Sequence, residues 1–445
     1  MIQTFVNAWK VPELRKKLLF TLMIILLYRI GANLFVPYVN VAMMETYSEV
    51  LTDGIFGMLS LMSGSAFSQA TFFALSVSPY ITASIVMQLL SIAIPALEKM
   101  SKDEEGKKKI AAATRWVTVG LAVITAYGYV NLFNMNGWLT VQKGDSHYVF
   151  AWFVMIACFC AGASLIMWLA EKINEHGIGN GISIILFANI ISGMTGSIQS
   201  MIAMLQDNFG SWLTGWNLVW GIVGVVISIA LTLAAIVLIV WFTNSERRIK
   251  IIYAKKVVGR KMYGGQKTNL PLKMNMAGVM PVIFASSIVS IPATIAAFIP
   301  NADGKNWFVN FVNNWLSSNS PIYIIIFIAL IVAFSYFYIA ISFNPVEVAN
   351  NIRNNGGAII GIRPQEMAPF IKKILKRVTM MGAIFLIVIA ATPLIVSAIV
   401  NAVGGSFTSL AFTGTSLLIA VGVALETVRD LEAQLSMRNY KGFLD

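Results

Sequence analysis

Residues 321–342 read PIYIIIFIALIVAFSYFYIAIS, a run that contains no charged side chain. A helix of about 20 apolar residues is long enough to cross the hydrocarbon core of a bilayer. The rest of the chain has the same character, because AVILMFWYC make up 57% of its 445 residues and DEKR only 12%. The surface of a soluble protein needs roughly 25–35% charged residues. The sequence therefore predicts a polytopic membrane protein.

Segments of this kind recur along the whole chain and number ten. Ten divides into two sets of five, and because five is odd the second set would run through the membrane in the opposite direction, as in inverted-repeat transporters. The expected fold class is an all-α integral membrane protein with ten transmembrane helices in two inverted five-helix halves. The expected spans lie near 18–37, 72–95, 116–136, 149–170, 182–204, 217–243, 276–299, 321–342, 378–400 and 407–426.

These spans also define the expected domains. An N-terminal half holds the first five spans and a C-terminal half holds the other five, with an external hinge loop between them and a cytoplasmic tail after the last span. The expected ranges, in that order along the chain, are 1–204 for the N-terminal half, 205–216 for the hinge loop, 217–426 for the C-terminal half and 427–445 for the tail.

Lysine and arginine predict the orientation in the membrane. The formal net charge is +12, and 29 of the 32 Lys and Arg residues fall on one side of the expected spans, against Lys143 and Lys305 on the other. Cytoplasmic loops carry the excess of positive residues, so both termini are expected in the cytoplasm. Arg29, the remaining one, lies near the external end of the first span, where a long side chain reaches the interface without needing a functional role.

Residues 54–69 read GIFGMLSLMSGSAFSQ, which is apolar but too short to cross a bilayer and is interrupted by glycine. A short apolar segment of this kind is typical of a re-entrant or an interfacial element. Irregular backbone at membrane depth must be covered by protein or line a cavity. A re-entrant helix and an interfacial helix both remain open from the residues alone.

Motifs for bond-breaking chemistry are missing from the sequence. No Walker A pattern and no H-E-x-x-H occur, and GIGNGIS at 177–183 lacks the spacing of a dinucleotide fingerprint. Cys158 and Cys160 lie within one apolar run, where helix packing is the simpler interpretation. We expect no enzyme activity, no metal and no cofactor. Ion-coupled transport is also disfavoured, because it needs carboxylates or histidines within spans; a carrier of uncharged solutes remains an alternative.

Two expected cytoplasmic loops, 244–275 and 344–377, are longer than neighbouring helices require. In the first, IKIIYAKKV alternates apolar and basic residues, which predicts a strand, and the glycines at 264–265 would suit a turn. Two long basic projections on one face favour an acidic partner such as ribosomal RNA or an acidic protein surface. The alternative is that they only enforce topology and contact anionic lipid.

Several runs of residues, in this order and at this spacing, resemble the SecY family of bacterial protein-conducting channels along almost the full chain. The matching runs are RIGANLFVP (29–37), SPYITASIVMQLL (78–90), MWLAEKINEHGIGNGISI (167–184), RRIKIIYAKK (247–256), LPLKMNMAGVMPVIFASSI (270–288), FNPVEVANNI (343–352), GIRP (361–364), GTSLLIAVGVALE (414–426) and YKGF (440–443).

This resemblance implies a channel that conducts unfolded secretory polypeptides across the bacterial plasma membrane and releases membrane segments sideways. It also implies a ring of aliphatic side chains that closes the pore at mid-membrane. An apolar constriction excludes water and ions by dewetting, although ordinary helix packing would explain any one of these residues read alone. The ring positions that match are Val77, Ile81, Ile182, Leu186, Ile283 and Ile419.

The resemblance assigns two further features. The first is a plug below the ring, and the second is a lateral gate between the second and seventh spans, at which Gln88 and Asn275 match polar positions. Both gate residues could equally form simple hydrogen bonds between helices. The plug positions are Ile55, Phe56, Met58, Leu59, Leu61 and Met62.

Partners are also implied by the resemblance: the motor ATPase SecA, the ribosome with its ribosomal RNA, SecE-like and SecG-like small membrane subunits, signal peptides, unfolded preproteins and membrane lipid. Gln365 stands where the family usually has Gly, and Phe370 stands near a common Tyr, so the second loop is expected to differ in conformation at its tip. The expected docking residues are Arg247, Arg248, Lys255, Lys256, Arg260, Lys261 and Arg363.

Overall fold

The computed structural model describes most of the chain, including the segments that carry the expected ring. The described residues are 2–40, 66–67, 69–141, 145–193, 230, 232–253, 256–258, 261–263, 267–299, 306–316, 320–402 and 414–441. The expected hinge loop, 205–216, lies outside them, as do all six expected plug positions, Ile55, Phe56, Met58, Leu59, Leu61 and Met62.

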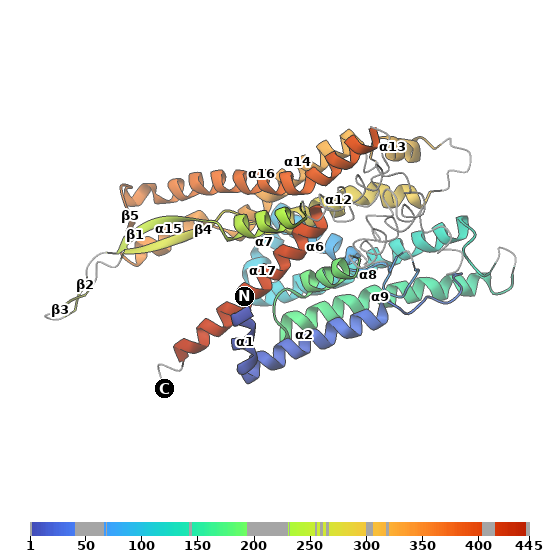
Figure 1. The fold of residues 1–445 in the computed structure, drawn as a ribbon, viewed down its shortest axis with the longest axis horizontal. Helices are drawn as coiled ribbons and strands as arrows, with labels where there is room; N and C mark the ends of the chain where they lie inside the picture. The colour runs from blue at the N-terminus through green and yellow to red at the C-terminus, as the bar shows by residue number, and fades with distance from the viewer. Residues whose placement is uncertain are drawn as a thin grey trace, which may run out of the picture.

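Helices dominate the described residues, as the composition predicts, and most of them lie along the long axis of the molecule (Figure 1). Between residues 2 and 193 they are α1 (Ile2–Lys10), α2 (Pro12–Gly31), α6 (Ser78–Ala93), α7 (Pro95–Lys102), α8 (Glu104–Met135), α9 (Tyr148–His176) and the helix Gly181–Gly193. Between residues 232 and 441 they are the helix Thr232–Asn244, α12 (Met280–Ala297), α13 (Trp307–Trp315), α14 (Pro321–Ser342), α15 (Pro345–Asn354), the short 3-10 turn η1 (Pro364–Glu366), α16 (Met367–Ala402) and α17 (Gly414–Lys441).

Four helices among the described residues are long and apolar enough to cross a membrane, and a bent pair makes a fifth. The bent pair is α6 with α7, whose axes differ by 110°. The bend falls at Pro95, which has no N–H for the preceding turn and disfavours helical backbone in the residue before it. α14 coincides with the expected span 321–342, whereas the ten-span count stays a prediction.

Strands form where the alternation of apolar and basic residues predicts one. β1 (Glu246–Tyr253) pairs antiparallel with β4 (Lys267–Lys273), and the short strands β2 (Lys256–Val258) and β3 (Lys261–Tyr263) form a hairpin that reverses between Val258 and Lys261. The glycines at 264–265, where we expected the turn, lie outside the described residues.

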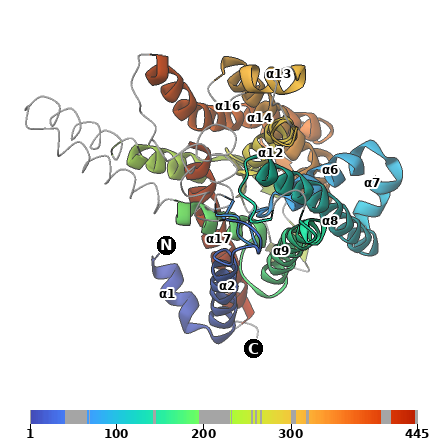
Figure 2. The same ribbon diagram turned by 90° about the vertical axis from the view of Figure 1, so that its right-hand side faces the viewer.

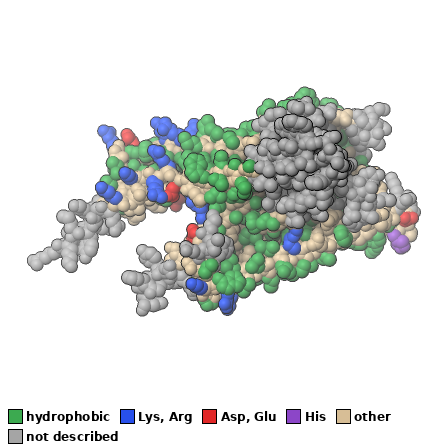
Figure 3. Space-filling view, viewed as in Figure 1, with side chains coloured by type: hydrophobic (Ala, Val, Ile, Leu, Met, Phe, Trp, Pro, Cys, Tyr) green, Lys and Arg blue, Asp and Glu red, His purple; other side chains and the backbone are tan. Residues whose placement is uncertain are grey.

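The two long basic loops share one sheet. β5 (Gly357–Ile359), from the second loop, pairs antiparallel with β1 from the first. Side chains of β1, β4, β5, α15 and α16 then close a small hydrophobic core, in which Ile251, Leu272, Ile359 and Met367 are buried. Figure 3 shows that most of the visible Lys and Arg side chains gather at this end of the molecule.

Candidate functional site

The six expected ring residues all belong to one large hydrophobic cluster, which also contains many other buried residues of the helices. Five of the six are buried and Ile182 is partly buried, and their grouping into a ring stays a prediction. They come from four elements that are distant in sequence: the start of α6, the helix Gly181–Gly193, α12 and α17. The residues are Val77, Ile81, Ile182, Leu186, Ile283 and Ile419.

A hydrogen bond between two buried side chains links the first two of these elements. The Asn189 side-chain amide donates to Ser76 Oγ at 3.1 Å, and Asn189 is fully buried. Ser76 has a left-handed backbone with φ of 50°, in the turn that leads into α6. A bond of this kind in a low-dielectric interior is strong and expensive to leave unmade. Asn189 therefore holds the helix Gly181–Gly193 against the turn before α6, and its polar character within an apolar helix was the sequence signal for it.

The segment 177–183, which matched no catalytic motif, fixes the start of the helix Gly181–Gly193. The N–H of Gly179, which has φ of +75°, donates to Asp430 Oδ2 of α17 at 3.0 Å. The N–H of Ile178 donates to Thr21 Oγ1 of α2 at 3.2 Å. These bonds tie the segment to the first and last long helices of the bundle.

Gly181, the first residue of that helix, lies against α9. Its N–H donates to Asn174 Oδ1 at 2.7 Å, and a Cβ built on Gly181 would lie 2.0 Å from the carbonyl oxygen of Ala170. Only glycine fits this approach, because a Cβ would overlap backbone that cannot turn away. The position of Ile182 and Leu186 thus depends on the absence of one methyl group.

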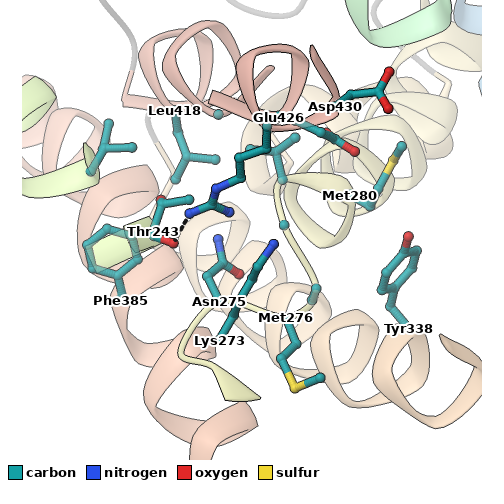
Figure 4. A pocket seen from close by; sticks show the side chains of 16 residues that line it. Thr243, Lys273, Asn275, Met276, Met280, Tyr338, Phe385, Leu418, Glu426 and Asp430 are labelled. Carbon is teal, nitrogen blue, oxygen red and sulfur yellow. Dashed lines mark hydrogen bonds between the residues drawn. The ribbon is translucent and has the colours of Figure 1, made fainter. Parts of the chain in front are cut away.

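A cavity of about 350 Å³ opens between α12, α14, α16, α17 and the helix Thr232–Asn244 (Figure 4). Asn275 is buried at its wall, with 8% of its surface exposed, and no described residue forms a hydrogen bond with its side chain. The Arg429 guanidinium donates to the Thr243 carbonyl oxygen at 2.7 Å and to Asn244 Oδ1 at 2.8 Å. Burial, together with the nearby positive charge of Arg429, lowers the pKa of Lys273 at the rim of this cavity.

The two expected gate residues occupy different settings. Gln88 is half-buried on α6, where its amide donates to Ser84 Oγ of the same helix at 3.2 Å. Asn275 precedes α12 and faces the cavity. The helices α6 and α12 pack against each other, but no hydrogen bond joins Gln88 to Asn275 within the described part of the chain.

The basic surface is built on the shared sheet. Arg247, Arg248 and Arg363 are exposed there, and Arg248 Nε donates to Glu246 Oε1 at 2.7 Å. Lys256 and Lys261 lie on the outer hairpin, while Lys255 and Arg260 lie outside the described residues.

Gln365 lies in η1 and its backbone is not left-handed, whereas Gly361 takes a positive φ of +80°. The expected difference in conformation from the family at this tip stays a prediction.

A sequence profile of the SecY family matches residues 71–428. The chain is 40% identical, over its full length and that of the relative, to protein translocase subunit SecY of Streptomyces scabiei, and 39% identical to that of Mycobacterium tuberculosis. The chain belongs to the SecY family. SecY-family proteins are multi-pass proteins of the plasma membrane, and they are channel subunits of a protein translocase rather than enzymes.

Solved structures agree on the fold. A protein-conducting channel superposes with a TM-score of 0.63 at 18% identity, covering 96% of each chain. Sec61 in a canine ribosome-channel complex from the endoplasmic reticulum superposes with a TM-score of 0.60 at 17% identity over the same shares. The described helices therefore have the arrangement of SecY and Sec61 channels.

Proposed function

We propose that this SecY-family chain closes its pore with the six aliphatic residues of the ring and opens it for unfolded polypeptide. The observation that supports the proposal is that all six, from four separate elements, belong to one hydrophobic cluster in which five of them are buried. A constriction without polar groups stays dry, which blocks ions, and it offers a passing chain no hydrogen bond that would hold it. Ten spans in two inverted halves, with the plug at 54–69 and both termini cytoplasmic, complete the proposed channel.

A lateral exit between α6 and α12 is the second part of the proposal. These helices carry Ile81 and Ile283 of the ring and pack directly on each other. Opening exchanges that contact for contact with an apolar signal helix, so signal hydrophobicity supplies the differential affinity that shifts the equilibrium. The Asn275 amide, which has no hydrogen-bond partner among the described residues, and the half-buried amide of Gln88 make this seam more polar than the rest of the helix packing.

The basic sheet is the proposed docking surface for SecA or the ribosome. Arg247, Arg248 and Arg363 project from a folded platform, and a platform presents charge with less loss of entropy than a mobile loop. Relatives of known structure include channels bound to ribosomes. SecE-like and SecG-like subunits belong to the same proposed assembly, with energy supplied by the docked motor or ribosome.

A disulfide crosslink tests the pore. In a chain with Cys158 and Cys160 replaced by alanine, Ile81→Cys is combined with an arrested preprotein that carries one cysteine, and the complex is oxidised. We expect an adduct that requires the arrested chain. The matched control is Ile325→Cys on α14, which is 65% exposed on the outside of the bundle and should give none.

Two results would contradict the proposal. Equal amounts of adduct at Ile81→Cys and Ile325→Cys would mean that the arrested preprotein contacts the channel unspecifically. No adduct at Ile81, with the arrested complex verified and the thiol reactive to a small probe, would instead favour a carrier of uncharged solutes.

A further inference from the structure

The helix α13 carries a row of exposed aromatic side chains that neither the pore nor the basic sheet explains. Trp307, Phe311 and Trp315 recur every four residues, so they share one edge of the helix. Their exposed fractions are 77%, 42% and 49%, and the rings of Trp307 and Phe311 stack with centroids 5.6 Å apart. A contiguous row of exposed apolar side chains marks a site of contact with another protein or with a membrane.

The opposite edge of α13 packs against the end of α12. Val309 and Val312 are buried there with Ala296 of α12, in a small cluster of their own. The helix is therefore held in place by its inner edge, and the aromatic row is turned away from the protein.

Position and composition indicate what the row meets. The helix α13 lies at the end of the molecule opposite the basic sheet (Figure 1) and at the perimeter of the bundle in the end-on view (Figure 2). Residues 306–316 contain no charge, only asparagine among apolar residues. The neighbouring exposed apolar surface includes Ile325 on α14, which α13 contacts, so the row continues the surface that faces lipid.

We propose that α13 is an interfacial anchor whose aromatic row inserts into the headgroup region of the lipid leaflet at this end of the molecule. Tryptophan favours that region, because its ring has both an apolar body and an N–H donor. A short uncharged helix with one aromatic edge lies in the interface rather than across it. The anchor then sets the height of the end of α12 relative to the membrane. Because α12 forms one side of the proposed lateral exit, an effect of this height on the exit rests on the function proposed above. The interfacial position of α13 does not.

Spin labels measure this position directly. In the chain with Cys158 and Cys160 replaced by alanine, we would label Phe311→Cys in vesicles of phosphatidylcholine and phosphatidylglycerol and compare collisions with oxygen and with a water-soluble nickel chelate. Ile325→Cys on α14 is the lipid reference and Lys250→Cys on β1 is the water reference. We expect the oxygen-to-nickel ratio at Phe311 to lie between the references and above the water value.

Two outcomes would overturn the anchor. A ratio equal to that of Lys250→Cys would place the row in water, and an immobile label that neither reagent reaches would mean that protein covers it.

A second experiment, on a different variant, does not depend on correct folding around a substituted Phe311. The double variant Trp307→Phe/Trp315→Phe should lose part of the fluorescence quenching that lipids brominated near the headgroup cause in the parent chain. An unchanged quenched amplitude would also overturn the proposal.

Discussion

Gly181→Ala is the sharpest perturbation of the ring that leaves every ring residue unchanged. The added methyl group would lie 2.0 Å from the Ala170 carbonyl oxygen. Carbon–oxygen contacts settle at about 3.3 Å, so the start of the helix must withdraw from α9 by about 1.3 Å. The helix carries Ile182 and Leu186, and such a shift is close to the radius of water, about 1.4 Å.

Two effects follow from that displacement. Overpacking at a rigid contact costs about 1–3 kcal/mol of the free energy of unfolding. Ile182 and Leu186 would also move away from the other ring residues, so ions should leak through the resting channel. The matched control is Gly193→Ala on the same helix, where no described heavy atom lies within 4 Å of the new Cβ. Alanine there should be neutral or stabilise by up to about 1 kcal/mol.

The two variants would be compared by denaturant unfolding and by conductance across a planar bilayer. We expect lower stability and higher conductance for Gly181→Ala alone. Equal unfolding free energies would refute the close approach to α9. A destabilised Gly181→Ala that conducts no more than the parent would refute the idea that this approach positions the ring.

Four further outcomes are expected. Ile81→Asp should raise the ion conductance of the resting channel, because a charge hydrates the constriction, whereas Ile81→Leu should not; equal conductance of the two would remove the residue from the ring. Arg363→Glu should lower SecA-driven preprotein uptake at unchanged expression more than Arg353→Glu, an exposed arginine on α15, and equal losses would point to general charge. Asp430→Ala should lower the free energy of unfolding by about 1.5–3 kcal/mol, since it removes a charged acceptor from a backbone N–H, and Asp430→Asn by less. The lowered pKa of Lys273 means that the unfolded chain binds this proton more tightly, so stability should rise with pH up to about 10.4, and Lys273→Gln should flatten that rise.

The sequence predicted features that depend on local pattern. Lipid requires a continuous apolar helix, so α14 coincides with its expected span, and the alternation in 249–257 predicted β1. The expected span 72–95 was only partly right, because α6 begins at Ser78 after a series of tight turns.

Features that depend on contacts between residues distant in sequence could not be predicted from the sequence. β5 has three residues, too few for a pattern, and forms because β1 offers a free edge. Asn189 reads as one polar residue in an apolar helix, and only the fold brings it to Ser76. For the ring, composition permits a dry constriction, but only the resemblance to a family selected the six residues.

The shared sheet also has a mechanical meaning. Because β1 and β4 both lead to the outer hairpin, tension applied there along the strands is carried by the two strands together, and it loads the hydrogen bonds between β1 and β5 in shear. A partner that pulls or pushes on the outer hairpin therefore acts on a rigid three-stranded sheet. At its base, β1 continues directly from the helix Thr232–Asn244 and β4 leads into α12. A force on the outer hairpin is thus transmitted to both of these helices at once.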